Sequence, residues 1–160
     1  MTAANYRNLF LYMRTIISIL VAMSVFPLTV ESAEQITGPV AAEIIRVIDG
    51  DTLLVEAAPW PQQRIEVYVR IRGIDAPEMK SKCPAIRQAA EQARSVLDEM
   101  AASSPHIRLT NISGDKYFGR IVADVAMQDG RNPAQEMLSA GLAAGYDGGR
   151  KPRIACASTN

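Results

Sequence analysis

The stretch from Arg64 to Arg72 constrains the fold more than any other part of this 160-residue chain. Aliphatic residues alternate there, from Ile65 to Ile71, with charged residues and a tyrosine. A period of two places the aliphatic side chains on one face of a β-strand and the arginines on the other. The stretch therefore predicts a half-buried strand whose polar face presents Arg70 and Arg72.

Similar patterns predict the other secondary structure elements. Strands are expected at 40–47, 52–57, 107–112 and 121–127, with turns at 49–51 and 59–61. Apolar residues recur at helical spacing from 86 to 100, and Pro84 suits a first helical position, so we expect an amphipathic helix there. A short helix is expected from Asn132 to about Ala140. Segments 34–39 and 73–83 are expected to be a linker and a loop.

The order of these elements is three strands, a helix, a pair of strands and a helix. In one small domain this order predicts a β-barrel with helices (α+β). The best candidate is a five-stranded OB-fold barrel with a packed amphipathic helix and a short late helix. Such barrels commonly bind nucleic acids. Strand count alone does not establish this fold.

The first 33 residues resemble a secretory signal peptide. Arg7 and Arg14 precede an apolar run at 15–30, and the small residues Ser32 and Ala33 follow it. We expect cleavage near Ser32 or Ala33, which leaves residues 34–160 as one mature domain in the periplasm or the medium. The mature protein is expected to be a monomer without stable membrane association.

Two alternatives stay open for this N-terminal region. Met13 followed by Arg14 already begins a complete signal, so translation could start at Met1 or at Met13. An uncleaved membrane anchor is disfavoured, because the run of about 16 residues contains Pro27 and falls short of the roughly 20 that span a bilayer.

Charge and cysteine content narrow the possible functions. Seventeen basic residues balance seventeen acidic ones, which argues against a protein that coats nucleic acid by bulk electrostatics. An enzyme that gathers a few arginines at one site remains compatible with this balance.

Cys83 and Cys156 are the two cysteines, and an even count in an exported protein favours a disulfide over two free thiols. With the single histidine, His106, distant in sequence, they make a poor zinc site.

Acidic residues cluster in two segments. Asp49 and Asp51 lie in the expected first turn, where a bound cation would relieve their repulsion, although Asp-Gly is also common in plain hairpin turns. Asp75 and Glu78 follow the arginine-bearing strand, and Asp75 could join Asp51 on a hard cation. The alternative for this second segment is a surface salt-bridge cluster.

Basic and aromatic residues gather in a third segment, Lys116 to Arg120. Bases can stack on aromatic rings, and Arg120 could bind a phosphate together with Arg70. The alternative is an ordinary basic turn in which Tyr117 and Phe118 cover the core. Each of the three segments is a weak signal by itself.

Taken in this order, the three segments resemble the staphylococcal nuclease (thermonuclease) family. The matching residues are Val47 to Thr52, Arg70 to Glu78, and Asp115 to Tyr117 with Gly119-Arg120. The resemblance extends over about 42–146. It implies an OB-fold barrel and Ca²⁺-dependent hydrolysis of DNA and RNA with little sequence preference.

The resemblance also implies roles for individual residues. Asp51, Asp75 and the backbone carbonyl of Ala76 match the calcium ligands, and Asp49 matches a supporting acid. Glu78 matches the acid that activates water, and Arg70 and Arg120 match the phosphate-binding arginines. Lys116 and Tyr117 correspond to nucleotide contacts, although Phe118 interrupts the Tyr-Gly-Arg pattern of the family.

Three function classes compete on these grounds. A non-catalytic OB-type nucleic-acid-binding module would not need Asp51, Asp75, Glu78, Arg70 and Arg120 together, and neither would a structural envelope protein. Because all five are present, the sequence favours an exported, Ca²⁺-dependent nuclease. A bridge between Cys83 and Cys156 would tether the C-terminal segment of the chain. His106 is expected to be a solvated loop residue.

Overall fold

The structure is a computed structural model that describes residues 34–149 and residue 156. The expected signal peptide at 1–33 lies outside the described residues. Within the described part, neither helix is both long enough and apolar enough to cross a membrane.

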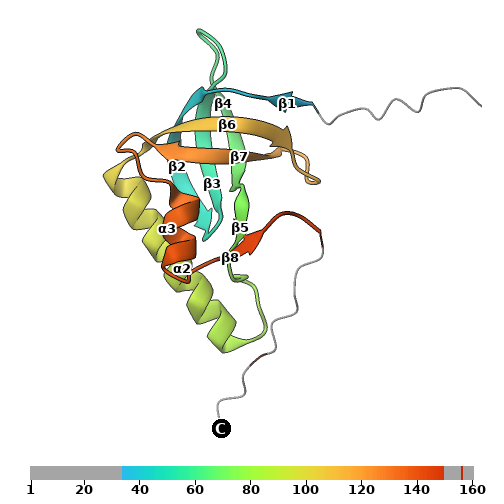
Figure 1. Ribbon diagram of the computed structural model, residues 1–160, viewed down its shortest axis with the longest axis vertical. Helices are drawn as coiled ribbons and strands as arrows, with labels where there is room; N and C mark the ends of the chain where they lie inside the picture. The colour runs from blue at the N-terminus through green and yellow to red at the C-terminus, as the bar shows by residue number, and fades with distance from the viewer. Residues whose placement is uncertain (1–33, 150–155, 157–160) are drawn as a thin grey trace, which may run out of the picture. The chain divides into compact units, whose positions relative to one another are not determined.

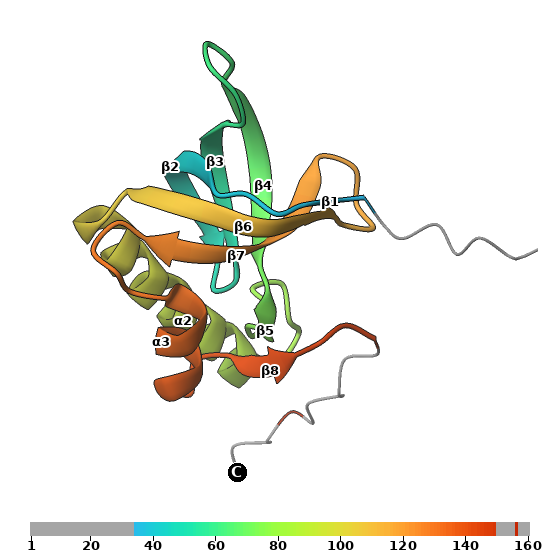
Figure 2. The same cartoon turned by 45° about the horizontal axis from the view of Figure 1, so that its top comes forward.

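Five strands close into a barrel (Figures 1 and 2). They are β2 (Val40–Asp49), β3 (Thr52–Ala58), β4 (Ile65–Ile71), β6 (His106–Gly114) and β7 (Arg120–Met127). β2 pairs antiparallel with β3 and β6, β3 pairs antiparallel with β4, and β4 runs parallel to β7. The antiparallel pairing of β6 with β7 closes the ring. This mixed barrel with two helices confirms the predicted α+β OB-fold.

The two helices lie side by side at one end of the barrel (Figures 1 and 2). Helix α2 (Pro84–Ser103) buries a stripe that includes Ala93 and Leu97, and α3 (Pro133–Ser139) buries Met137. These side chains join the barrel interior, where Leu53 and Val69 are fully buried. The alternation predicted for β4 is observed at Val69 and Ile71, which are buried in the core, whereas Ile65 at the start of the strand is exposed.

Three short strands were not predicted. β1 (Gln35–Ile36) pairs with β6 in the segment expected to be a linker, so that expectation was wrong. β5 (Gly73–Asp75) pairs with β8 (Ala144–Tyr146), so the segment expected to be a loop begins as a strand. A strand of two or three residues has no measurable period, and its pairing partner lies about 70 residues or more away in sequence. The β5–β8 pair fixes the backbone at Asp75 and Tyr146.

Candidate active site

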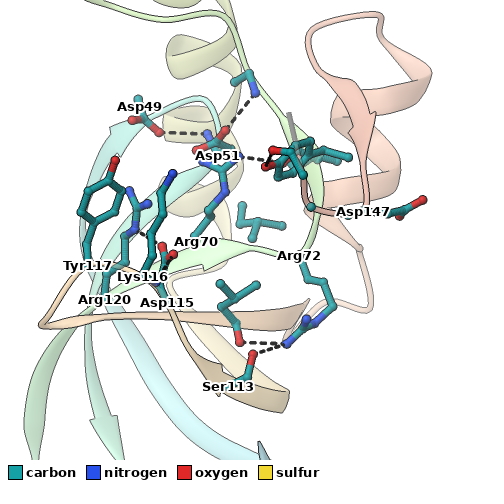
Figure 3. Close-up of a pocket in the computed structure, with 18 of the residues that line it drawn as sticks. Asp49, Asp51, Arg70, Arg72, Ser113, Asp115, Lys116, Tyr117, Arg120 and Asp147 are labelled. Carbon is teal, nitrogen blue, oxygen red and sulfur yellow. Dashed lines mark hydrogen bonds and ion pairs between the residues drawn. The ribbon is translucent and has the colours of Figure 1, made fainter. Parts of the chain in front are cut away.

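A cleft of about 1090 Å³ brings the three sequence segments together. It is lined by the turn between β2 and β3, strand β4, the loop after β5, the turn between β6 and β7, and the residues that follow β8. The predicted site residues that line it are Asp49, Asp51, Arg70, Ala76, Glu78, Lys116, Tyr117 and Arg120. In Figure 3, Asp115, Lys116, Tyr117 and Arg120 gather on one side of the cleft, next to Arg70 and Asp51.

Arg70 joins the two carboxylates that the sequence assigned to metal binding. Its Nη1 donates to Asp51 Oδ1 at 3.1 Å, and its Nη2 donates to Asp75 Oδ1 at 2.7 Å. The side chains of Asp51, Arg70 and Asp75 are only 5%, 13% and 17% exposed. The alternative of a surface salt-bridge cluster is therefore wrong, because these ion pairs are largely buried.

Asp51 is held by further hydrogen bonds from its own turn and from the loop after β5. Thr52 Oγ1 donates to Asp51 Oδ1 at 2.8 Å, and the backbone N–H of Ala76 donates to Asp51 Oδ2 at 2.9 Å. The backbone N–H of Asp51 donates to Asp49 Oδ1 at 3.1 Å. Asp49 thus shapes the turn that presents Asp51.

Gly50 lets this turn approach helix α2. A Cβ atom at Gly50 would lie 2.8 Å from Cβ of Ala76 and 2.8 Å from Cβ of Ala93. Real Cβ atoms do not come so close, so any larger residue would push apart the turn, the loop and the helix. The glycine of the Asp-Gly-Asp segment therefore serves close packing.

Burial controls the protonation of this region. Loss of hydration raises the pKa of Asp51 to about 6, and the charge of Asp49 adds to this, although Ala76 N–H and Arg70 act in the opposite direction. Burial would lower the pKa of Arg70, but the charge of Asp51 and the hydrogen bond to Asp75 outweigh it, and the pKa is raised. A second cation at Asp51 would compensate the lost hydration of its carboxylate.

The predicted ligands fit Ca²⁺ chemically. Carboxylate oxygens and a backbone carbonyl are hard donors, and Ca²⁺ takes about six to eight oxygen ligands. Asp51 and Asp75 bind the same guanidinium group, so the two carboxylates face one position, and Ala76 adjoins Asp51. Among residues 34–149 and 156, no three His, Cys, Asp or Glu side chains form a group that could hold a metal ion.

The turn between β6 and β7 also lines the cleft. Asp115 Oδ2 accepts a hydrogen bond from Arg120 Nε, and the Tyr117 ring lies 4.7 Å from the Arg120 guanidinium carbon and 5.0 Å from Lys116 Nζ. Tyr117 and Phe118 are exposed, so the alternative in which these aromatics cover the core is wrong.

Sequence reasoning missed several residues of the cleft. Arg72 lines it, but its Nη2 donates to the carbonyls of Asn111 and Val122 and to Ser113 Oγ, at 2.5, 3.1 and 2.9 Å, so it braces β4 against β6 and β7. Tyr146 also lines the cleft, with its ring 5.6 Å from the guanidinium carbon of Arg70. Tyr146 lies in β8, a strand of three residues that is too short to show a period in the sequence.

The two cysteines lie together in the structure. Their sulfur atoms are bonded at 2.06 Å, with the Cα atoms 5.6 Å apart. Cys83 immediately precedes α2, and Cys156 follows the segment after β8 whose residues Asp147 to Gly149 line the cleft. His106 lies away from these groups, in a separate hollow of about 380 Å³.

Comparison with known proteins gives two findings. The chain matches a family model described as staphylococcal nuclease homologue over residues 68–155, which includes Arg70, Asp75, Glu78 and Arg120. It is 33% identical over 104 residues to a protein named uncharacterized endonuclease from Escherichia coli, and 32% identical over 104 residues to one of the same name from Escherichia coli O157:H7. Each alignment covers 65% of this chain and 60% of the relative's length.

Proposed function

The chain belongs to the staphylococcal nuclease family, and on that premise we propose that it is a Ca²⁺-dependent nuclease that hydrolyses phosphodiester bonds in DNA and RNA. One observation carries the proposal. Asp51, Arg70, Glu78 and Arg120 line the same cleft, and Asp75 is hydrogen-bonded to Arg70. The names of the Escherichia coli relatives agree with an endonuclease activity.

Each of these residues has a role that its chemistry supports. Asp51, Asp75 and the Ala76 carbonyl would hold Ca²⁺, which when bound supplies Lewis-acid polarisation of a phosphate oxygen. Glu78 would accept a proton from the attacking water. Arg70 and Arg120, which both line the cleft, would donate hydrogen bonds to the phosphate as its negative charge increases in the transition state. Groups that contact phosphate carry little sequence information, so cleavage is expected to be largely non-specific.

The assay that tests the function uses purified residues 34–160 and both DNA and RNA substrates. We expect both to be degraded with Ca²⁺ and cleavage to stop in excess EDTA. Glu78→Gln should lose most of the activity and keep the fold. Cleavage that persists in EDTA would contradict the metal assignment, and full activity of Glu78→Gln would contradict the role of Glu78.

We also propose that residues 1–33 export the protein to the periplasm or the medium and are then removed, leaving a monomer that is not held at the membrane. The sulfur–sulfur bond between Cys83 and Cys156 supports this, because structural disulfides form in oxidising compartments. N-terminal sequencing of the protein from fractionated cells should place the new terminus near Ser32 or Ala33. Mass spectrometry without reductant should find the bridge, and two free thiols would contradict it.

A further inference from the structure

Arg72 is the arginine of the cleft whose charge is least compensated by carboxylates. Arg70 meets two carboxylates within 3.1 Å, and Arg120 donates to Asp115. Arg72 is held instead by two backbone carbonyls and a hydroxyl group, none of which carries a net charge. Asp124, with which it forms an ion pair, is 3.6 Å from its Nε and does not line the cleft. Much of the positive charge of Arg72 is therefore available to a ligand in the cleft.

Hydrogen bonds fix the guanidinium group of Arg72 and leave one nitrogen for a ligand. Nη2 donates to the carbonyls of Asn111 and Val122 and to Ser113 Oγ, and Nε is buried. Within residues 34–149 and 156, Nη1 has no hydrogen-bond partner. Because the side chain is 37% exposed and lines the cleft, Nη1 is the donor that a bound group can reach. A side chain held in this way loses little conformational entropy when it binds.

Ser113 supplies a second donor next to Arg72. Its Oγ accepts from Arg72 Nη2 at 2.9 Å, so the hydrogen of the hydroxyl group remains to be donated to another acceptor. Ser113 also lines the cleft. In Figure 3 a dashed line joins the end of the Arg72 side chain to Ser113, and this pair lies apart from Tyr117 and Arg120. A guanidinium N–H beside a hydroxyl group suits an anion with several acceptor oxygens, such as a phosphate.

The place of Arg72 in the chain relates this pair to the phosphate proposed at Arg70. The two arginines are two positions apart, and Arg72 directly follows β4, with its backbone N–H donating to the carbonyl of Ala123 at 2.9 Å. Two residues of an extended chain span about 7 Å, a step similar to that between neighbouring phosphates of a nucleic-acid strand. A strand bound through one phosphate at Arg70 can therefore bring the next phosphate to Arg72 and Ser113.

Resting on the proposed function, we propose that Arg72 and Ser113 bind the phosphate next to the one at Arg70 and Arg120, so that the cleft holds two neighbouring phosphates of one substrate strand. This second contact extends the site along the strand without reading its sequence, because phosphates carry no base information. It favours polynucleotides over substrates with a single phosphate. Because contact with a phosphate releases counterions, the contribution of Arg72 to affinity depends on salt.

The test measures binding by fluorescence anisotropy at several salt concentrations, with Ca²⁺ present and in a Glu78→Gln background that suppresses cleavage. One probe is a labelled oligothymidylate. The other has the same length and bases, but a single phosphate is charged and the others are replaced by neutral methylphosphonates. Arg72→Gln should weaken binding of the fully charged probe about tenfold at low salt. It should also reduce the slope of log affinity against log salt concentration by about 0.7. Binding of the probe with one charged phosphate should stay within about twofold of the parent.

Two further variants separate the charge of Arg72 from its surroundings. Ser113→Ala should weaken binding of the fully charged probe about threefold and leave the salt slope unchanged, because it removes a donor but no charge. Arg108→Gln is the matched control, since Arg108 is an exposed arginine of β6 that lines the separate hollow near His106. It should bind both probes like the parent.

The proposal is overturned if Arg72→Gln binds the fully charged probe normally, or if Arg108→Gln changes the salt slope as much. It is also overturned if Arg72→Gln loses affinity equally for both probes, which would show a merely structural role. If Arg72→Gln does not fold, Ser113→Ala decides by the same comparison of probes. If the parent binds the fully charged probe but the wild type cleaves nothing, the proposed nuclease function fails, and the probes still decide the role of Arg72. A parent that binds neither probe overturns both proposals.

Discussion

Two neighbouring parts of the candidate site are built in different ways. The buried half, defined as Asp51, Arg70, Asp75 and Ala76, is tied by hydrogen bonds between the β2–β3 turn, β4 and the loop after β5. The turn half, defined as residues 115–120, projects Tyr117 and Phe118 into solvent. We therefore expect changes of charge in the buried half to affect the stability of the fold more than changes in the turn half do.

The largest expected effect is a loss of catalytic rate in a variant of the turn half. Arg120→Ala should lower kcat on single-stranded DNA about 10²- to 10³-fold, because it removes a donor to the developing charge of the phosphate. The free energy of unfolding should fall by less than on removal of Arg70, because Arg120 is 24% exposed and forms one ion pair, whereas Arg70 is 13% exposed and forms two. Steady-state kinetics and urea unfolding measure the two quantities.

The matched control for this variant is Arg108→Ala, at an exposed position of β6 outside the cleft. Its rate and stability should equal those of the wild type. If Arg120→Ala unfolds several kcal/mol more easily than the wild type, the turn half is structural and the distinction between the two halves is lost.

In the buried half, the next effect is on stability. Arg70→Met in EDTA should lower the free energy of unfolding by about 3 kcal/mol, because it leaves the buried carboxylate of Asp51 without its partner. The double variant Asp51→Asn/Arg70→Met should regain part of this loss, since the buried charge of Asp51 is then removed while that of Asp75 stays. Urea unfolding at neutral pH measures both, and a loss below about 1 kcal/mol for Arg70→Met would contradict the structural role of the pair.

A third prediction concerns pH. The pKa of Asp51 in the folded protein is about 6, above its ordinary value of 3.8, so the folded state binds more protons than the unfolded state between these values. Stability in EDTA should therefore fall as pH rises from about 4 to about 6, and the contribution of Asp51 is about 2 to 3 kcal/mol.

Asp51→Asn, which does not titrate, isolates this contribution. The free energy of unfolding of the variant minus that of the wild type should increase between pH 4 and pH 6.5 and then level off. Ca²⁺ should reduce the difference at pH 7, by compensating the charge of Asp51 in the wild type. A difference in unfolding free energy that is constant with pH would contradict the raised pKa of Asp51.

The smallest expected effect tests the packing behind the buried half. Gly50→Ala should destabilise the protein by about 2 kcal/mol, because its Cβ would overlap those of Ala76 and Ala93. Gly114→Ala is the control, since a Cβ at Gly114 meets no atom within 4 Å. Thermal unfolding should separate the two variants, and equal melting temperatures would contradict the close approach of the turn to α2.

The fold was predictable where a pattern extends over several residues. The alternation in β4 and the helical spacing in α2 are both long enough to show a period, and both elements are found close to the expected bounds. β1, β5 and β8 were missed because two or three residues show no period and depend on partners far away in sequence. The parallel pairing of β4 with β7, which brings Arg120 into register with Tyr68, was not predicted either.

The candidate site was likewise predictable only in part. The sequence named the acids and arginines, because their types and order match the family, but it gave no account of their contacts. The role of Gly50 was missed because Asp-Gly also suits a plain turn, and only the proximity of Ala76 and Ala93 shows why a glycine is required. The restraint of Arg72 by the carbonyls of Asn111 and Val122 likewise has no signal in a linear pattern.

The sequence alone determined the class of fold, the family resemblance and the residue types of the cleft, because periodicity and motif order are properties of neighbouring residues. The tertiary structure decided that Arg70 joins Asp51 to Asp75, that burial raises the pKa of Asp51, and that Tyr117 and Phe118 are exposed to solvent. Each of these depends on distances between segments brought together only when the barrel closes, and dehydration and ion pairing are set by those distances.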